Sequence, residues 1–137
     1  MYSTGMPALA FAHLAVTVSS LERSVPWYTK LFDAEPIADA QAPGYRFVVW
    51  AQPSFALHHF PEHTDEPFDE RRNGLDHIAF HCLDRPELER WGVRLGELGI
   101  AHAEILDEWY GSGLSFRDPD NIALELFAPR PRSAPHL

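Results

Sequence analysis

Histidines lie on one face of two predicted strands. In residues 74–82, apolar side chains alternate with a face that carries His77 and His81, as in a buried β-strand. Residues 9–18 have the same form, with His13 on the corresponding face. The same pattern near both ends of the chain predicts that the chain contains one structural unit twice.

The spacing of the two units predicts which residues are equivalent. A shift of 64 positions aligns His13 with His77, and a shift of 67 aligns the strand of His58 with the strand of Glu125. One loop insertion would explain the difference. Each unit is therefore predicted to begin with a histidine-bearing strand and to end with a strand that carries His58 or Glu125 at an equivalent point.

The four residues have the chemistry of a metal site. Imidazole and carboxylate groups together bind divalent zinc, nickel, manganese, cobalt or iron. An alanine stands two residues from each candidate on the same face, which leaves space around it. A single histidine of this kind would be more typical of a core or rim position, but four at repeat-related positions favour a metal. The predicted ligands are His13, His58, His77 and Glu125, with His59 competing for the role of His58 if the strand slips by one residue.

Four segments resemble the vicinal oxygen chelate superfamily: residues 13–18, 21–28, 74–80 and 116–126. That superfamily includes glyoxalase I, bleomycin-resistance and fosfomycin-resistance proteins, methylmalonyl-CoA epimerase and extradiol dioxygenases. The resemblance covers about residues 9–128 and implies an α+β fold. Two tandem βαβββ modules would form a curled, cup-shaped mixed β-sheet with helices on the outside. It also implies one metal ion in the cup, held by the four residues above, and a homodimer.

The resemblance implies chemistry on a small oxygenated substrate. Four protein ligands leave about two octahedral positions open, so the substrate can chelate the metal through two neighbouring oxygens. The metal then stabilises an enediolate or enolate, which is lyase or isomerase chemistry. In glyoxalase-like enzymes the glutamate of the last strand can be both ligand and base, a role that falls on Glu125. His81 and Tyr110 are further acid–base candidates, although His81 is equally typical of a rim histidine.

Two other function classes stay open. Without His58, the set becomes two histidines and one carboxylate, which suits ferrous iron and dioxygen in an extradiol-type dioxygenase. The other class is a resistance protein that binds an antibiotic without catalysis, stacking it on Phe47, Trp50, Trp109 and Tyr110. Glutathione is disfavoured as a substrate component, because glyoxalase I usually has arginine where this chain has Thr17 and glutamate where it has His58.

The composition excludes several partners. With 137 residues, of which 45% are apolar, the chain can bury the core of one domain spanning residues 1–137. Its net charge of −9 disfavours nucleic acid and anionic membranes, so a small molecule is the expected partner. The single cysteine, Cys82, is predicted to be a core thiol. No signal peptide or membrane-spanning segment is recognisable, and a cytoplasmic location is expected.

The remaining elements follow from caps, prolines and apolar periodicity. We expect modules at about residues 9–60 and 74–128, a linker at 61–73 and a mobile tail at 129–137. Ser19 is predicted to cap a helix that reaches residue 32, with a bend or a later start caused by Pro26. Asp84 is predicted to cap a second helix that stops at Gly99. Further strands are expected at residues 35–38, 45–51, 55–60, 101–106, 113–117 and 123–127.

Two loops are candidates for covering the cup. In the linker, Phe68 and Arg71 either stay in a solvated crossover or fold over the cup or a partner subunit. Gly111 and Gly113 are expected to belong to a loop that closes on the cup.

Overall fold

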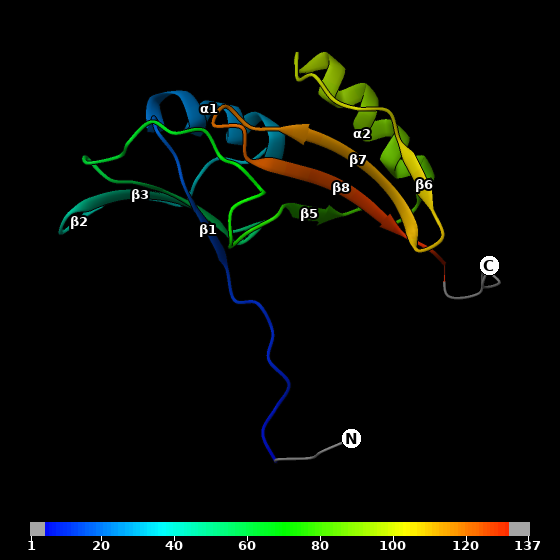
Figure 1. Ribbon diagram of the computed structural model, residues 1–137, viewed down its shortest axis with the longest axis horizontal. Helices are drawn as coiled ribbons and strands as arrows, with labels where there is room; N and C mark the ends of the chain where they lie inside the picture. Colours follow the sequence, from blue (N-terminus) through cyan, green and yellow to red (C-terminus); the bar gives the residue numbers. More distant parts are fainter. Residues whose placement is uncertain (1–4, 132–137) are drawn as a thin grey trace.

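The computed structural model describes residues 5–131 and contains the same module twice (Figure 1). The first module consists of β1 (Leu14–Thr17), α1 (Leu21–Phe32), β2 (Ala38–Ala42), β3 (Tyr45–Trp50) and β4 (Phe55–His59). The second consists of β5 (Ile78–His81), α2 (Arg85–Glu97), β6 (Leu106–Glu108), β7 (Gly111–Arg117) and β8 (Ala123–Pro129). The predicted α+β fold with two βαβββ modules is confirmed.

Each module forms its own four-stranded sheet, with its first strand beside its last. The strand orders are β1-β4-β3-β2 in the N-terminal sheet and β5-β8-β7-β6 in the C-terminal sheet. The first and last strands are parallel, and the other neighbours are antiparallel. Parallel strands cannot be joined by a tight turn, so the helix forms the crossover. Both helices lie on one side of the sheets (Figure 1), and we call the opposite side the open face.

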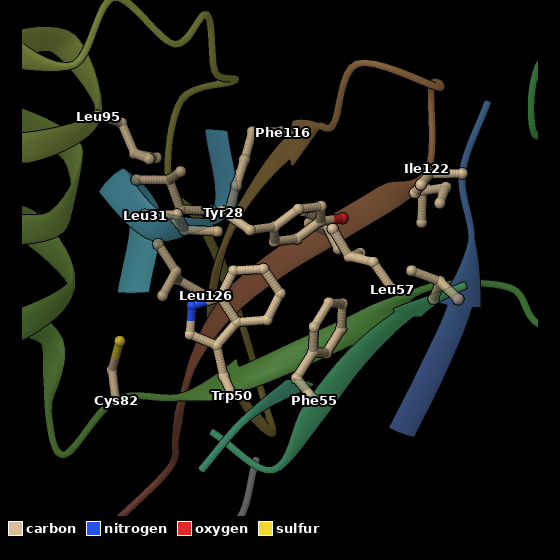
Figure 2. Close-up of a cluster of buried hydrophobic side chains, with 14 of the residues drawn as sticks. Tyr28, Leu31, Trp50, Phe55, Leu57, Cys82, Leu95, Phe116, Ile122 and Leu126 are labelled. Carbon is tan, nitrogen blue, oxygen red and sulfur yellow. The ribbon is translucent and has the colours of Figure 1, made fainter. Parts of the chain in front are cut away.

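The two modules share one hydrophobic core (Figure 2). Buried side chains come from α1, β3, β4, α2, β7 and β8, and Phe32 of α1 packs edge-on against Phe80 of β5 with ring centroids 5.7 Å apart. Trp27, also on α1, packs against Phe116 of the second module at 6.3 Å. Because α1 contributes to both modules, neither sheet has a core of its own.

A buried polar cluster joins the modules as well. The Tyr28 hydroxyl donates to Asp118 Oδ2 at 2.7 Å, and Asp118 Oδ1 accepts from the backbone amides of Asp120 and Ile122, each at 2.8 Å. Burial raises the pKa of both Tyr28 and Asp118. Next to them, the Ser19 hydroxyl donates to Asp120. We call this group, Ser19, Tyr28, Asp118 and Asp120, the module clasp.

The clasp explains why one helix cap was predicted wrongly. Ser20, and not Ser19, caps α1 by accepting from the amide of Arg23, because the Ser19 hydroxyl is held by Asp120. The helix begins directly after this cap, so Pro26 does not delay it. Pro26 lies inside the helix instead, where it leaves the Glu22 carbonyl without its usual amide partner.

The second helix follows its prediction. The Asp84 side chain accepts from the amide of Glu87 at 3.0 Å. Helix α2 ends at Glu97, and Gly99 follows with a left-handed φ of 74°. Cys82, just before the helix, is buried in the core as predicted, and burial raises the pKa of its thiol to about 11.

Several strand boundaries differ from the predictions. Residues 9–13 precede β1 without belonging to it, and residues 74–77 similarly precede β5. Strand β2 lies at residues 38–42, because these five residues pair across the Pro43-Gly44 turn with β3. The strand predicted at 101–106 is wrong: its backbone makes an isolated bridge from His102 to Phe116 before β6 begins. The prediction of a mobile tail is wrong at its start, because Pro129 belongs to β8 and the Arg130 amide donates to the Tyr110 carbonyl at 2.9 Å; residues 132–137 of that tail lie outside the described residues.

The linker between the modules is anchored at one residue. Phe68 is half-buried against the core, its amide donates to the carbonyl of Asp120, and Asn121 donates to the Phe68 carbonyl. Arg71 instead is exposed and pairs with Asp69. Phe68 thus folds back on the module junction, while Arg71 stays in solvent. Within residues 5–131 no helix combines the length and apolar character needed to cross a bilayer.

Replacing Tyr28 with phenylalanine should lower the free energy of unfolding by about 1–3 kcal/mol, because Asp118 loses a buried hydrogen bond. Urea unfolding at neutral pH measures the change. Tyr45→Phe, at a half-exposed position on the open face, is the matched control and should alter stability by less than about 0.5 kcal/mol. Equal stability of the two variants would show that the clasp does not stabilise the junction.

Candidate functional site

The pairing of β5 with β8 brings two predicted ligands together on the open face. Ala79 of β5 lies opposite Glu125 of β8. His77 stands two residues before Ala79, so its side chain points to the same face. The His77 Nε2 atom lies 3.8 Å from Glu125 Oε1. Residues that are far apart in the sequence thus form one pair of potential ligands.

Asp76 orients the His77 ring. Its Oδ1 atom lies 2.7 Å from His77 Nδ1. An ionised carboxylate only accepts hydrogen bonds, so in a neutral ring that is bonded to Asp76 the proton is on Nδ1 and Nε2 carries a lone pair. Nε2 and Glu125 Oε1 are therefore two acceptors directed at the same space, which a cation can bridge. A carboxylate behind a histidine is also the usual support of a metal-bound imidazole.

Two glycines of β7 make room for side chains of β8, one of them Glu125 of this pair. A Cβ atom at Gly113 would lie 2.7 Å from Glu125 Oε2, and a Cβ at Gly111 would lie 2.4 Å from Phe127 Cζ. Side chains of β8 therefore lie across β7 at these two positions. The predicted loop at Gly111 and Gly113 is wrong, because both residues belong to the strand. Alternating glycines within a strand pattern were the signal that the backbone is closely approached there.

The other two predicted ligands lie on the N-terminal sheet. His13 is exposed just before β1, and His58 is on β4. Both line one cavity of about 290 Å³ on the open face, together with Tyr45 and Phe47. Within residues 5–131, no three His, Cys, Asp or Glu side chains lie close enough together to hold one metal ion. The described chain thus brings His77 and Glu125 together, but not His13 or His58 with them.

Strand register also changes the equivalence expected from the repeat. Glu125 pairs with Ala79, whereas His58 pairs with Thr17, two residues beyond the matching position of β1. The counterpart of Glu125 in the first module is Ala56, opposite Ala15. His58 corresponds instead to the position of Phe127, two residues after Glu125. The predicted equivalence of His58 with Glu125 was therefore wrong.

The surroundings of His58 are aromatic. Its ring stacks on Tyr45 with centroids 5.1 Å apart and on Phe47 at 5.7 Å. His59 points to the opposite face, where its Nδ1 lies 3.0 Å from the Val18 carbonyl oxygen. His58 is therefore the histidine of this strand that faces the cavity, and its role as a ligand stays a prediction.

The predicted acid–base residues lie at the other end of the same sheet. His81 is exposed and pairs with Phe127, one step of two residues from Glu125. The Tyr110 ring is half-exposed and stacks on Phe127 with centroids 5.9 Å apart. Trp109 packs edge-on against Tyr110 at 5.3 Å. Tyr110 thus stacks on Phe127, and His81 lies beside Phe127 only through the pairing of the strands; the roles of both residues in catalysis stay predictions.

One predicted stacking residue is not available to a ligand. Trp50 is 1% exposed in the shared core, where its Nε1 donates to the Ala34 carbonyl at 2.9 Å. Trp50 lies two residues after Val48 and therefore shares the buried side of β3 with it. The aromatic residue type alone did not indicate this burial. Phe47, on the opposite side of the same strand, does face the cavity.

Comparisons with known proteins identify the family of the chain. The family model described as Glyoxalase/Bleomycin resistance protein/Dioxygenase superfamily matches residues 10–126. A solved structure described as a glyoxylase/bleomycin resistance protein/dioxygenase domain from Frankia sp. EAN1pec is 30% identical, with a TM-score of 0.82 over 95% of this chain and 98% of that one.

Three of the curated relatives carry the following enzyme names. Metallothiol transferase FosB of Bacillus licheniformis is 29% identical over 122 residues, which cover 86% of this chain and 74% of the transferase. Catechol-2,3-dioxygenase of Bacillus subtilis is 31% identical over 124 residues, which cover 86% of this chain. The chain spans only 41% of that dioxygenase, and 23% of another dioxygenase relative from the same strain, MhqA.

In metal-free protein, His77 should be in the Nδ1–H tautomer, because the Asp76 carboxylate accepts a hydrogen bond from Nδ1–H. Free histidine prefers the other tautomer, so long-range ¹H–¹⁵N correlation spectra at pH about 8, above the ordinary histidine pKa, distinguish the two. Asp76→Ala should return the ring to the Nε2–H form. An Nε2–H signal for His77 in the unmodified chain would contradict the proposed orientation.

Proposed function

Because the chain belongs to the Glyoxalase/Bleomycin resistance protein/Dioxygenase superfamily, we propose that it is a metal-dependent enzyme acting on a small oxygenated substrate. His77 and Glu125 of one subunit hold a divalent metal, and His13 of a second subunit completes the site. The chemistry is of the lyase or isomerase type, in which a substrate is chelated through two neighbouring oxygens. The metal, when bound, serves as a Lewis acid that stabilises negative charge on those oxygens.

One observation carries the proposal: an imidazole nitrogen and a carboxylate oxygen, both potential metal ligands, face the same space. His77 Nε2 and Glu125 Oε1 are 3.8 Å apart, and the Asp76 carboxylate lies 2.7 Å from the far nitrogen of the ring, where it favours the neutral tautomer with Nε2 unprotonated. Such a pair repels unless a cation lies between its members. Imidazole and carboxylate are ligands of zinc, nickel, manganese, cobalt and iron alike, so the donor set fits a transition metal without selecting one.

A second subunit supplies the missing ligand. No third ligand lies near the pair among residues 5–131, and His13 is exposed on the open face of the other sheet. In a symmetric dimer, the N-terminal sheet of each subunit can face the C-terminal sheet of its partner, which makes two equal sites. The cup predicted from the resemblance is then formed across the dimer.

Glu125 has a second oxygen for proton transfer. While Oε1 faces His77, Oε2 lies against the Cα of Gly113, where any larger residue would collide with it. Oε2 is the atom that we assign as acceptor of a carbon-bound proton from the substrate. Asp76 keeps the His77 ring in place during this transfer, and Ala79 leaves space beside the carboxylate.

The aromatic cavity is the expected wall of the substrate site. Tyr45 and Phe47 stack on His58, so the His58 ring is oriented by its neighbours and presents an edge to the cavity. In this arrangement His58 contacts the substrate and the metal has three protein ligands. A fourth ligand at His58 is the alternative, and variants at this position distinguish the two.

A dioxygenase is the second candidate. The three protein ligands proposed above, two histidines and one carboxylate, also suit ferrous iron and dioxygen. The register that separates His58 from the Glu125 position favours this set, and catechol-2,3-dioxygenase of Bacillus subtilis is a relative. In this case the substrate is a small aromatic diol.

Metal content should fall when either member of the pair is changed. Full-length protein reconstituted with Mn²⁺, Fe²⁺, Ni²⁺ or Zn²⁺ should hold about one ion per chain, measured by plasma mass spectrometry. His13→Ala, His77→Ala and Glu125→Ala should each lose most of it. Gly113→Ala should also lower affinity by displacing the carboxylate, whereas Gly96→Ala, with open space around it, should not. His58→Ala should keep the metal if three ligands suffice.

Mixed dimers test where the ligands come from. His13→Ala and Glu125→Ala chains, each unable to bind alone, are refolded together in equal amounts. A mixed dimer has one site that lacks both residues and one intact site. Random pairing makes about half of the dimers mixed, so about one quarter of the wild-type metal should return. No recovery in a confirmed mixture of dimers would contradict a site shared between subunits. Absence of metal from the wild type after reconstitution would contradict the metalloenzyme proposal itself.

Oxygen uptake separates the two reaction classes. The Fe²⁺-loaded protein should not consume dioxygen with catechol if the chemistry is of the lyase or isomerase type, and an oxygen electrode detects the difference. Glu125→Ala protein is the control for uncatalysed oxidation. Uptake that depends on Glu125 would overturn the lyase or isomerase assignment and establish the dioxygenase.

A further inference from the structure

The segment before β1 leaves the body of the molecule as an apolar arm. Residues 5–12 have the sequence Gly-Met-Pro-Ala-Leu-Ala-Phe-Ala and are all exposed. Leu9 is 103% exposed and Phe11 is 97% exposed, the two most exposed large apolar side chains among the described residues. Figure 1 shows this arm running away from the sheets on the side opposite the helices. A fully exposed leucine and phenylalanine on one short segment are typical of a surface that is covered in an assembly.

The position of the arm indicates what covers it. The arm leads directly into His13, which the proposed function assigns to a site on a second subunit. It carries no charge in a chain whose net charge is −9, so it is a segment through which two like-charged copies can approach each other. The occupant that fits both observations is a second copy of this chain.

The C-terminal sheet offers an apolar surface at the matching place. Trp109 is 62% exposed and Tyr110 is 50% exposed, and their rings form a row with Phe127. We call these three residues the aromatic row. It begins two residues from Glu125 along β8 and continues away from the metal pair onto the turn between β6 and β7.

Spacing relates the arm to the row. In an extended chain, alternate residues share one side and are roughly 7 Å apart, so Phe11 and Leu9 follow His13 on the same side. Glu125 and Phe127 are separated by the same two-residue step on β8. When His13 reaches the partner's metal pair, Phe11 can therefore reach the start of the partner's aromatic row, and Leu9 can reach its outer end.

We infer that residues 5–12 form an exchanged arm, which packs Phe11 and Leu9 on the aromatic row of a second copy and thereby seats His13 beside that copy's His77 and Glu125. The inference rests on the proposed function for the role of His13, but the packing itself is independent of metal. Tyr110 is then a residue of the subunit interface. The arm, being uncharged, binds by burying apolar area and not by pairing with the acidic surface.

The first experiment measures dimerisation of the full chain by sedimentation equilibrium, in EDTA and in Mn²⁺. Phe11→Asp should raise the dimer dissociation constant by at least about tenfold, because a charge is placed in two symmetric apolar contacts. Val93→Asp is the matched control, since Val93 is 67% exposed on α2 and should leave the constant unchanged. Both positions are exposed in the single chain, so neither change should unfold it. A wild type that is monomeric in both buffers, or a Phe11→Asp variant that dimerises normally, would overturn the inference.

A double-mutant cycle tests the contact itself. Phe11→Ala and Trp109→Ala should each weaken the dimer, and the double variant should be little weaker than either single one, because both remove the same contact. Phe11→Ala combined with Val93→Ala should show independent effects. Independent effects of Phe11 and Trp109 would show that the arm does not lie on the aromatic row. If the cycle shows coupling but the wild type never binds metal, the arm inference stands and the proposed function fails.

Discussion

The candidate site depends on the parallel pairing of the first and last strands of a module. Two parallel neighbours require a long connection, and here that connection contains α2, β6 and β7. The pairing places Glu125 opposite Ala79 and therefore beside His77. The side-chain period of a strand is two residues, so a slip of one residue would turn Glu125 into the core. Register is protected because the buried side chains Leu124 and Leu126 alternate with it on β8.

The two modules have the same topology but different open faces. In the second module the paired positions carry a small residue and a carboxylate, Ala79 and Glu125, whereas the first module has Ala15 and Ala56 there. The first module instead presents His58 stacked with Tyr45 and Phe47 along an open cavity. One sheet thus provides the ligand pair and the other an aromatic wall. Both modules have the same framework of strands and helix. Because their open faces differ, we propose that the second module binds the metal and the first contacts the substrate.

Contacts at the junction between the modules set how the two sheets of one chain lie relative to each other. Helix α1 packs on both modules, Tyr28 is bonded to Asp118, and Ser19 is bonded to Asp120. The contacts made by α1 are on the helix side of the sheets, opposite the open face (Figure 1). A junction held by a buried core and by a buried hydrogen bond fixes the relative positions of the sheets, which is why the proposed site takes its third ligand from a second subunit and not from a bend in the chain.

Local features of the sequence determined much of the outcome. Alternation placed His13 and His77 on one face and Cys82 in the core, because the two-residue period of a strand is independent of its partners. The cap of α2 at Asp84 was equally local, as was the turn at Pro43-Gly44. The resemblance, which depends on short segments of this kind, correctly predicted the α+β fold and the superfamily.

What only the tertiary structure decided depends on residues far apart in the chain. Ser19 lost its capping role to Ser20 because Asp120, from the second module, holds its hydroxyl. The register of β4 and β8 separated His58 from the position of Glu125, since a sequence shift cannot show how loop lengths align strands across a sheet. The orientation of His77 by Asp76 toward Glu125 likewise required the pairing of β5 with β8. Periodicity assigns a side chain to a face, but only long-range packing decides which side chain lies opposite it.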